Sequence, residues 1–329
     1  MTEGGDFDKL GRGAIWDGAI APCLHQNHIF RVRTDRARLL PSFLAIYATS
    51  RTARRYFVNA SKQTTNLATI NMTQVKAFPI PLPPLIEQQR IVDVYGSVEG
   101  SIRSTERLVS KLEQHRESLL QELLESQSHA DGGERLSVAE MEFEIKAGIT
   151  LGQHRSPRSN ARPYLRVANV QRGYLDLRDV SFIEASDAEL PAYRVQLGDI
   201  LLVEGHANPN EIGRCALVRD DPGMMLFQNH LFRLRSRRLN PEFSQLWLNS
   251  DSARKYWHRM CATSSGLYTI NSRSLRTLPV WVPDQDTQAR IVQSVRAIAD
   301  RLEFERRNVA KLHDLKVGLT DALLTGIRA

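Results

Sequence analysis

One long stretch of this chain occurs twice. The segment "TTNLATINMTQVKAFPIPLPPLIEQQRIV", which begins at Thr64, is echoed by "SGLYTINSRSLRTLPVWVPDQDTQARIV", which begins at Ser265. The Thr-Ile-Asn triplets at Thr69 and Thr269 stand 200 positions apart, and both stretches end in Arg-Ile-Val at the same spacing. An internal repeat of this length predicts that the chain folds as two versions of one unit.

The repeat extends upstream of these stretches, but not equally far in both copies. "PSFLAIYATSRTARRYF" from Pro41 aligns with "PEFSQLWLNSDSARKYW" from Pro241, and "QNHIFRVR" aligns with "QNHLFRLR" at a spacing of 202. Glu3 faces Glu204, and nothing before Glu3 remains to be aligned, whereas the second copy continues back to about Arg135. We therefore expect one complete unit and one that lacks its first half, with an unfinished core.

Each copy changes character once along the chain. Its first part mixes short β-type runs with Gly and Pro and one helix-like segment, which predicts a mixed α/β domain. Its second part is a long helix, preceded by prolines and with acids in the first turn. The expected α+β fold has four parts: a partial mixed domain at 1–83, a spacer helix at 84–125, a complete mixed domain at 126–283 and a second spacer helix at 284–329.

Apolar residues of both helices follow the 3.5-residue spacing of a coiled coil. The series is interrupted at matching places, by Thr105 and Arg116 in the first helix and by Glu305 and Lys316 in the second. An antiparallel pair with Arg116 against Glu305 and Thr105 against Lys316 gives every apolar position an apolar partner. These polar layers are predicted to fix the register, with one mixed domain at each end, related by a pseudo-twofold axis. The alternative is a solvated bundle or a dimerisation stalk.

Composition narrows the class of protein. The 44 Lys and Arg exceed the 37 Asp and Glu by seven, and the pI of about 9.5 favours an anionic partner such as nucleic acid. Three widely spaced cysteines indicate neither a disulfide framework nor a zinc site, so no metal is expected. No apolar run approaches the ~18 residues of a membrane span, and no signal peptide is visible, so we expect a cytoplasmic protein.

A basic mixed domain that leads through "PIPLPPLIEQQRIV" into a helix ending "LLQELL", and a second such pair ending "GLTDALLTGIRA", resembles the DNA specificity subunit of type I restriction-modification systems. The resemblance covers nearly the whole chain. It implies two target-recognition domains that each read one half of a split DNA target, with the helices as a ruler between them. It also implies two methyltransferase subunits and restriction/translocase subunits as partners, which carry the S-adenosylmethionine, ATP and Mg, and a chain that is itself no enzyme.

The motifs agree with a recognition role, because the chain has no amino-methylation motif, P-loop or acidic nuclease cluster. In the family, however, the first recognition domain has an N-terminal half. Either the start is mis-set or truncated, or the gene encodes a partial subunit that reads only one half-site. In the truncated case, a partner fragment could complete the domain. The alternatives are a truncated or half-specificity subunit without independent function, a coiled-coil interaction scaffold that does not bind DNA, and a self-contained methyltransferase or nuclease.

Three loops are predicted to supply the side chains that read bases or hold phosphates, and the first and third of them are poor in acids. The alternatives to DNA contact in these loops are a solvated basic loop, a docking surface for the methyltransferase, or ordinary turn-forming residues. His28 and His230 are interpreted as packed or structural histidines. The predicted DNA-binding residues are Arg155, Arg158, Arg162 and Arg166 in the first loop, His206, Asn208 and Asn210 in the second, and Ser264, Ser265, Tyr268, Asn271 and Arg273 with their counterparts Lys62, Gln63, Thr64 and Asn66 in the third.

Overall fold

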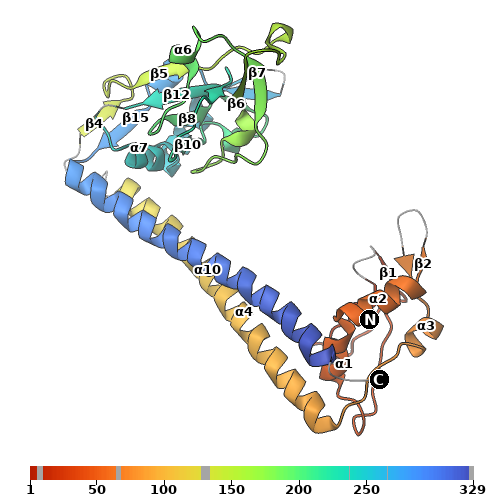
Figure 1. The fold of residues 1–329 in the computed structure, drawn as a ribbon. Coiled ribbons are helices and arrows are strands. Elements are labelled where there is room, and N and C mark those ends of the chain that lie inside the picture. Colours follow the sequence, from red (N-terminus) through yellow and green to blue (C-terminus); the bar gives the residue numbers. More distant parts are fainter. Residues whose placement is uncertain (6–9, 64–67, 127–133, 237, 265, 326–329) are drawn as a thin grey trace. The chain divides into compact units, whose positions relative to one another are not determined.

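The computed structural model describes residues 1–5, 10–63, 68–126, 134–236, 238–264 and 266–325 (Figure 1). Contacts divide the chain into two compact units, which are described separately. Unit 1 comprises Met1–Lys111 and Leu302–Ala329, and unit 2 comprises Leu112–Arg301. Both units contain part of the two long helices, α4 (Leu85–Gln121) and α10 (Gln285–Thr325).

Unit 2 is built on a four-stranded antiparallel sheet with the order β10-β8-β12-β5. Strand β8 is buried along its whole length, as its run of Ile, Leu, Leu and Val requires. Helix α7 packs against β10 at this sheet (Figure 1). The bounds are β5 (Glu144–Ala147), β8 (Ile200–Val203), β10 (Cys215–Leu217), β12 (Leu231–Arg235), α7 (Pro241–Leu248) and α8 (Asp251–Met260).

Smaller sheets complete unit 2. One has the order β11-β6-β7, one has the order β13-β14-β9, and β15 pairs with β4. Short helices connect them: η2 (Gln153–Arg155), η3 (Val167–Asn169), α6 (Leu190–Tyr193), η4 (Pro209–Glu211) and α9 (Ser272–Arg276). The strands are β4 (Glu134–Ser137), β6 (Ala161–Leu165), β7 (Ser181–Glu184), β9 (Gly205–His206), β11 (Leu226–Phe227), β13 (Ala262–Ser264), β14 (Leu267–Thr269) and β15 (Pro279–Val282).

Unit 1 joins three short helices to parts of the two long helices through one hydrophobic core. In its core the rings of Phe57 and Phe78 pack at a tilt, with their centroids 4.6 Å apart. The same core includes Ile91 of α4 and Leu324 of α10. A small sheet has the order β1-β3-β2. The bounds are β1 (Gly4–Gly5), α1 (Pro41–Ala48), α2 (Arg51–Ala60), β2 (Lys62–Gln63), β3 (Ala68–Thr69) and α3 (Met72–Lys76), and a π-helical turn η1 (Glu122–Ser126) follows α4 in unit 2.

The internal repeat is confirmed at the level of single hydrogen bonds. Ser50 and Ser250 each cap a helix by accepting a bond from the backbone N–H three residues on. The hydroxyl of Tyr56 donates to the carbonyl of Gln74, and that of Tyr256 donates to the carbonyl of Ser274. Because caps and tyrosine contacts recur at a spacing of 200, the two copies share the same local architecture in this part of the repeat.

A buried glutamine joins each mixed domain to its long helix. The Gln88 amide is fully buried, accepts from the backbone N–H of Leu40 and donates to the carbonyl of Pro83. Gln288 is equally enclosed and accepts from the N–H of Asn240. A buried amide that satisfies backbone groups on both sides holds the helix start against the preceding domain, which explains why the Gln of both "EQQR" and "DTQAR" recurs.

The long helices run antiparallel within unit 1, as expected, but the partner of Lys316 differs from the prediction. Its ammonium lies 2.5 Å from the Glu99 carboxylate and 5.0 Å from the centre of the Tyr95 ring. The Thr105 hydroxyl donates instead to the carbonyl of Ser101 in its own helix. The correction has a simple cause: a half-buried ammonium is neutralised by a carboxylate and not by a hydroxyl.

The second predicted polar layer stays a prediction, because Arg116 belongs to unit 2 and Glu305 to unit 1. Both long helices begin at the positions that the proline signals indicate, at Leu85 and Gln285. Among the described helices, none has both the length and the apolar character that crossing a bilayer requires.

Candidate nucleic-acid interface

The basic loop of the complete domain folds as η2 followed by β6, which pairs with β7. The Arg155 guanidinium makes two hydrogen bonds to the Glu189 carboxylate, at 2.7 and 3.1 Å, and its side chain is only 18% exposed. This contact lowers the pKa of Glu189 to about 2 and raises the pKa of Arg155. Arg155 therefore ties the loop to the segment before α6, a structural contact that leaves little of its charge at the surface.

Two more arginines of this loop are held by acids. Arg162 pairs with Asp187 and Arg166 pairs with Asp179, each at 2.7 Å. In both pairs the arginine is the less exposed partner and the carboxylate lies at the surface. A surface carboxylate beside each guanidinium weakens the attraction for a phosphate.

Arg158 differs from the other three. Its side chain is exposed, and the ion pairs among the described residues do not include it. Its backbone N–H donates to the Glu184 carboxylate, which fixes the loop while leaving the guanidinium facing solvent. Of the four arginines, Arg158 is the one that the structure leaves most accessible to a partner.

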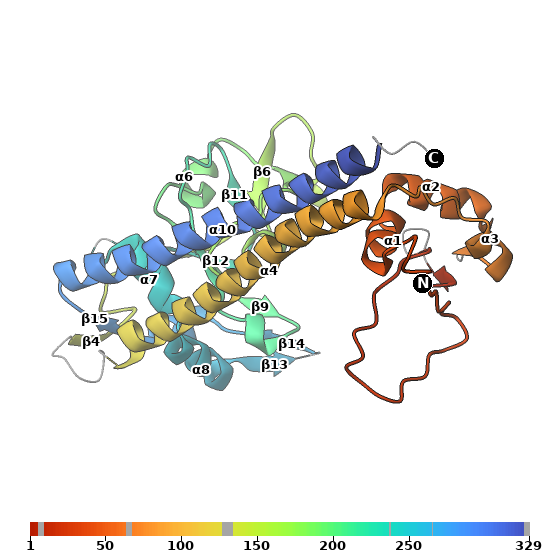
Figure 2. The same ribbon diagram turned by 90° about the horizontal axis from the view of Figure 1, so that it is seen from below.

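The second and third loops meet in one small sheet. His206 of β9 lies opposite Tyr268 of β14, and β14 pairs with β13 on its other side (Figure 2). The N–H of Asn208 donates to Nδ1 of His206, and the Asn208 side chain accepts from the N–H of Asn210. Residues that are about 60 positions apart in the sequence therefore present one continuous polar edge.

Helix α8 adds a side chain that the sequence reasoning missed. Nε2 of His258 lies 3.1 Å from the side-chain oxygen of Asn210, and Arg172 donates to the backbone carbonyl of Asn210. Burial lowers the pKa of Arg172, and the neighbouring Arg254 adds to this effect. No local motif reveals either residue, because His258 meets Asn210 through the packing of α8 against η4, and Arg172 reaches it from 38 positions away in the sequence.

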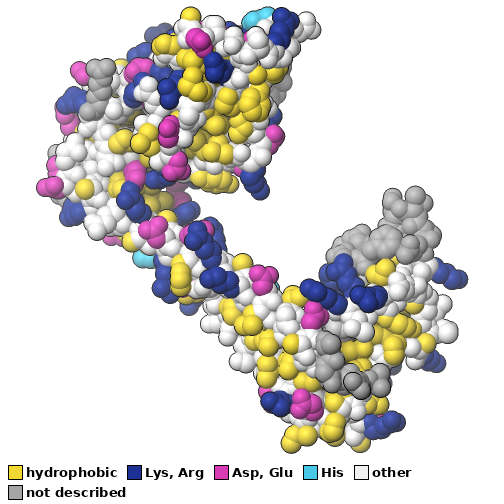
Figure 3. All heavy atoms as spheres, viewed as in Figure 1, with side chains coloured by type: hydrophobic (Ala, Val, Ile, Leu, Met, Phe, Trp, Pro, Cys, Tyr) yellow, Lys and Arg dark blue, Asp and Glu magenta, His cyan; other side chains and the backbone are white. Residues whose placement is uncertain are grey.

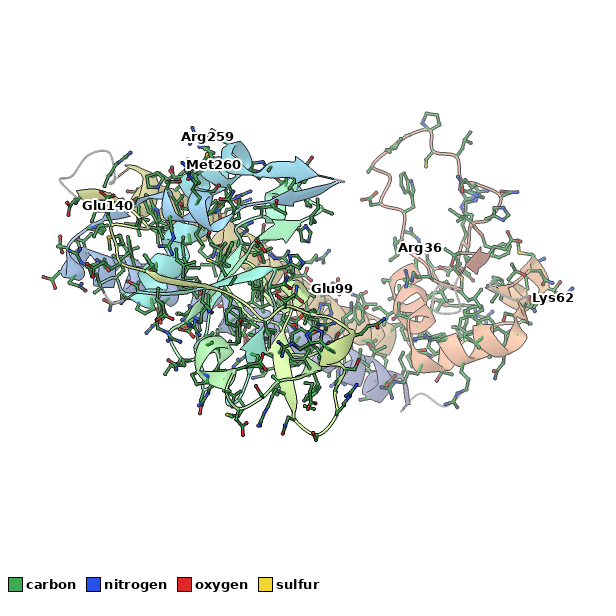
Figure 4. All side chains as sticks on the ribbon, turned by 90° about the horizontal axis from the view of Figure 1, so that it is seen from above. Arg36, Lys62, Glu99, Glu140, Arg259 and Met260 are labelled. Carbon is green, nitrogen blue, oxygen red and sulfur yellow. The ribbon has the colours of Figure 1, made fainter. Side chains whose placement is uncertain are left out.

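The remaining predicted residues have mixed roles. Asn271 caps α9 by accepting a hydrogen bond from the N–H of Ser274, and helix capping therefore explains in part why this Asn occurs in both copies. Arg273, in the first turn of α9, is exposed. Lys62 is exposed at the outer edge of unit 1 (Figure 4). Ser264 and Gln63 lie at strand ends, and Ser265, Thr64 and Asn66 fall outside the described residues.

His28 and His230 lie at the surface but make matching contacts. Nδ1 of His28 is 2.9 Å from the Glu3 carboxylate, and Nδ1 of His230 is 3.5 Å from that of Glu204. Burial raises the pKa of Glu204. In each copy, the pair links the residue just before β1 or β9 to the histidine of the "QNH" sequence.

Charge on the surface is patchy. On the faces seen in Figure 3, Lys and Arg side chains alternate with Asp and Glu and do not form one unbroken basic area. Figure 4 shows Arg259 at the end of α8, in the same unit as the β9-β14-β13 sheet. The described residues contain no group of His, Cys, Asp and Glu that could hold a metal ion.

Comparison with known proteins gives a consistent picture. Residues 16–114 match the family described as type I restriction modification DNA specificity domain. The chain is 26% identical over 269 residues to the type I restriction enzyme EcoKI specificity subunit of Escherichia coli (strain K12), covering 76% of this chain and 58% of that one. It is 23% identical over 285 residues to the StySPI specificity subunit of Salmonella potsdam, covering 82% and 61%. The chain thus spans about three fifths of the length of these curated relatives.

Solved structures share the fold. The crystal structure of the HsdS subunit from Thermoanaerobacter tengcongensis matches with a TM-score of 0.57 at 19% identity, covering 90% of this chain and 73% of that one. The S subunit of a type I restriction-modification system from M. genitalium matches with a TM-score of 0.51 at 15% identity, covering 88% and 74%.

Proposed function

We propose that this chain, which belongs with the specificity subunits of type I restriction-modification systems, is a sequence-specific DNA-recognition subunit that directs partner enzymes to their target. The observation that carries the proposal is the duplicated joint. In each unit a small three-stranded sheet is followed by a short helix with an Asn N-cap and then by a long helix. A buried glutamine near the start of each long helix accepts a hydrogen bond from the preceding domain. A joint that occurs twice suits a target with two halves.

The polar edge of unit 2 is suited to contact with a DNA groove. It presents histidine, asparagine and tyrosine side chains, and Arg158 beside β7 and Arg273 on α9 are exposed in the same unit. Such side chains make hydrogen bonds to base edges, and exposed guanidinium groups neutralise phosphates. Because Arg155, Arg162 and Arg166 are already paired with acids, we assign them to holding the loop rather than to DNA contact.

Catalysis is assigned to partner subunits. Two methyltransferase subunits would hold S-adenosylmethionine, and restriction/translocase subunits would use ATP and Mg. In this scheme the chain contributes base recognition and a docking scaffold, and it performs no chemical step. Its long helices and mixed domains are the surfaces on which such partners would assemble.

The test uses the full chain assembled with its methyltransferase partner. Target sites are selected from a randomised duplex library, and affinity for a selected site is then measured at several salt concentrations. Arg158→Ala and Arg273→Ala are expected to weaken binding by about tenfold, and a lost phosphate contact lowers the salt slope by about one unit. Arg178→Ala is the matched control, because that exposed arginine pairs with Asp176.

Three outcomes would overturn the proposal. A complex that shows no salt-dependent DNA binding would identify an interaction scaffold. Methylation or cleavage by the chain alone would identify an enzyme. Selection of no sequence at all by a correctly assembled complex would identify a subunit without independent function.

A further inference from the structure

In the loop that follows β9, the hydrogen-bond acceptors of three side chains are already engaged within the protein. Nδ1 of His206 accepts from the backbone N–H of Asn208 at 2.9 Å, and the side-chain oxygen of Asn208 accepts from the N–H of Asn210 at 3.0 Å. A backbone N–H can only donate, so these two bonds fix the roles of the side-chain atoms. The side-chain oxygen of Asn210 accepts from Nε2 of His258 at 3.1 Å, since an amide oxygen cannot donate.

The donor ends of the same side chains are left open. They make no hydrogen bond with the residues that the structure describes. With Nδ1 as an acceptor, the neutral imidazole of His206 carries its proton on Nε2. A planar amide whose oxygen is held on one side presents its NH₂ group on the other, so Asn208 and Asn210 each offer two N–H donors. His206 is half-buried and both asparagines are exposed, so a partner can reach these donors.

Charged groups beside the loop already have partners. Glu211, the one acid in the sequence between β9 and β10, pairs with Arg214 at 2.8 Å, and Arg214 also donates to two backbone carbonyls. The half-buried Arg172 donates to the backbone carbonyl of Asn210 at 2.8 Å. The described side chains of the loop thus present neutral donors. Phosphates are neutralised mainly by Lys and Arg, whereas base edges are read by hydrogen bonds, so neutral donors favour a base as the partner.

The breadth of the surface around the loop favours the major groove. Strands β13, β14 and β9 pair in that order, and α8 packs against η4 in the loop (Figure 2). A three-stranded sheet with its loop is too broad for a minor groove of about 6 Å, whereas the major groove is about 12 Å wide. There guanine shows two acceptors, O6 and N7, and no donor, while adenine and cytosine each show an amino donor and thymine shows one acceptor beside a methyl group.

We propose that the loop after β9 reads guanine in the major groove, through Nδ2 of Asn208, Nδ2 of Asn210 and Nε2 of His206. His258 is a positioning residue, because it holds the Asn210 oxygen and so turns the amide nitrogen outward. An asparagine with a free oxygen pairs instead with adenine, donating to N7 and accepting from N6. This inference rests on the proposed DNA-recognition function and adds the base that this part of unit 2 selects.

The test changes one group on each asparagine. Asn208→Asp and Asn210→Asp keep the oxygen that the protein uses and replace the outward NH₂ group by an acceptor. In the complex of the full chain with its methyltransferase partner, sites are selected from a randomised duplex library. Each variant should exchange one guanine of the selected site for cytosine, whose N4 amino group donates, with a change in preference of about tenfold.

A modified base tests the same contact at the level of one acceptor atom. Replacing that guanine by 7-deazaguanine removes N7, which should weaken binding of the unmodified chain by about fivefold and leave binding of the matching Asp variant unchanged. Gln196→Glu is the charge-matched control, because it adds a carboxylate at an exposed position of unit 2 outside this loop and sheet. It should leave every base preference unchanged.

His258→Ala tests the positioning role. It frees the oxygen of Asn210, so adenine should be accepted as well as guanine at the position that Asn210→Asp changes, and nowhere else in the site. A residue with a merely structural role would lower affinity without altering the selected base. Unaltered base selection in His258→Ala would therefore remove His258 from the proposal.

The outcomes separate this inference from the function on which it rests. Unchanged base selection in both Asp variants would overturn the inference alone. So would selection of an A·T pair by the loop, which a minor-groove contact gives. A uniform loss of affinity across sequences, with a changed salt slope, would assign the loop to phosphates and equally reject it. Selection of no sequence by the unmodified complex would overturn the proposed function, and this inference with it.

Discussion

Two glycines show how closely single residues are conserved between the copies. Gly11 has φ of +65° and Gly213 has φ of +69°, and a Cβ built at either would lie 2.3 Å from the ring of Phe57 or Trp257. Both glycines therefore combine a left-handed backbone with direct contact to an aromatic ring. The helix that carries the ring, α2 or α8, is seated against the loop by this contact.

We expect Gly213→Ala to lower the free energy of unfolding of unit 2 by about 3 kcal/mol, because the left-handed conformation and the clash with Trp257 both cost energy. Gly198→Ala is the control: its φ is +86° with no atom within 4 Å of the added Cβ, so about 1 kcal/mol is expected. Tryptophan fluorescence in urea, in a Trp16→Phe background, reports on unit 2 alone. Equal losses for the two variants would show that the ring contact is unimportant.

The ion pair of Arg155 makes the stability of unit 2 depend on pH. The pKa of Glu189 in the folded state, about 2, is below its value in the unfolded chain, so folding favours the carboxylate. The stabilisation is complete above the unfolded pKa of about 4.3 and is lost as the pH falls toward 2. Glu189→Gln should remove this dependence and cost about 1–2 kcal/mol at pH 7.

The measurement is urea unfolding followed between pH 6 and pH 3. Asp187→Asn is the matched control, because Asp187 is 82% exposed and its pair with Arg162 should contribute under about 1 kcal/mol. If the Glu189→Gln variant and the unmodified chain lose stability in parallel as the pH falls, the contact between Arg155 and Glu189 does not cause the pH dependence of stability.

At the scale of elements, a contact between the two long helices shows how their register is restricted. Within unit 1 the Glu99 carboxylate holds Lys316, whose pKa is raised by Glu99 and Tyr95 despite an opposing effect of burial. The contact lowers the pKa of Glu99. A polar layer of this kind restricts the register, since a slip would leave the half-buried ammonium without its carboxylate.

A double-mutant cycle tests this layer. Glu99→Gln and Lys316→Met should each destabilise unit 1, with a coupling energy of about 1 kcal/mol. The pair Glu106 and His313, whose charged atoms are 3.6 Å apart and whose side chains are both half exposed, should show a coupling near zero. Thermal unfolding followed by far-ultraviolet circular dichroism gives both coupling energies. A coupling energy for Glu99 and Lys316 no larger than that for Glu106 and His313 would show that the Glu99–Lys316 contact does not restrict the register of the helices.

The elements themselves could be predicted from the sequence, but their contacts could not. Proline and acid signals placed the starts of α4 and α10, because these signals act through local backbone chemistry. The partner of Lys316 was missed because a four-carbon side chain reaches along the groove to a residue outside the heptad position opposite it.

The candidate site shows the same limit. A stretch without acids around Arg155, Arg162 and Arg166 indicated a basic surface, yet Asp179, Asp187 and Glu189 fold back onto it from 13 to 34 positions away. Charge counted along the chain therefore overstated the charge presented in space. That His206 and Tyr268 meet through strand pairing was not predicted from the sequence, because the two loops lie about 60 positions apart.

At the scale of the whole molecule, the two copies differ in how much core they complete. Unit 2 buries Phe232 and Leu234 of β12 within its main core, while in unit 1 Phe30 is only half-buried and Val32 is exposed. The strand sequences are nearly the same, so the difference comes from the partner strands and not from local propensity. Equivalent side chains are thus fully buried in unit 2 and only partly buried or exposed in unit 1.

This difference should appear directly in hydrogen exchange of the isolated chain. We expect backbone amides at 13–16 and 29–33 to exchange at least about 100-fold faster than those at 215–218 and 231–235, because only the latter lie in a complete sheet. The helical residues 43–47 and 243–247, buried in both units, serve as the internal control and should be protected in each. Protection of 13–16 and 29–33 equal to that of their counterparts would mean that unit 1 completes its sheet without further strands.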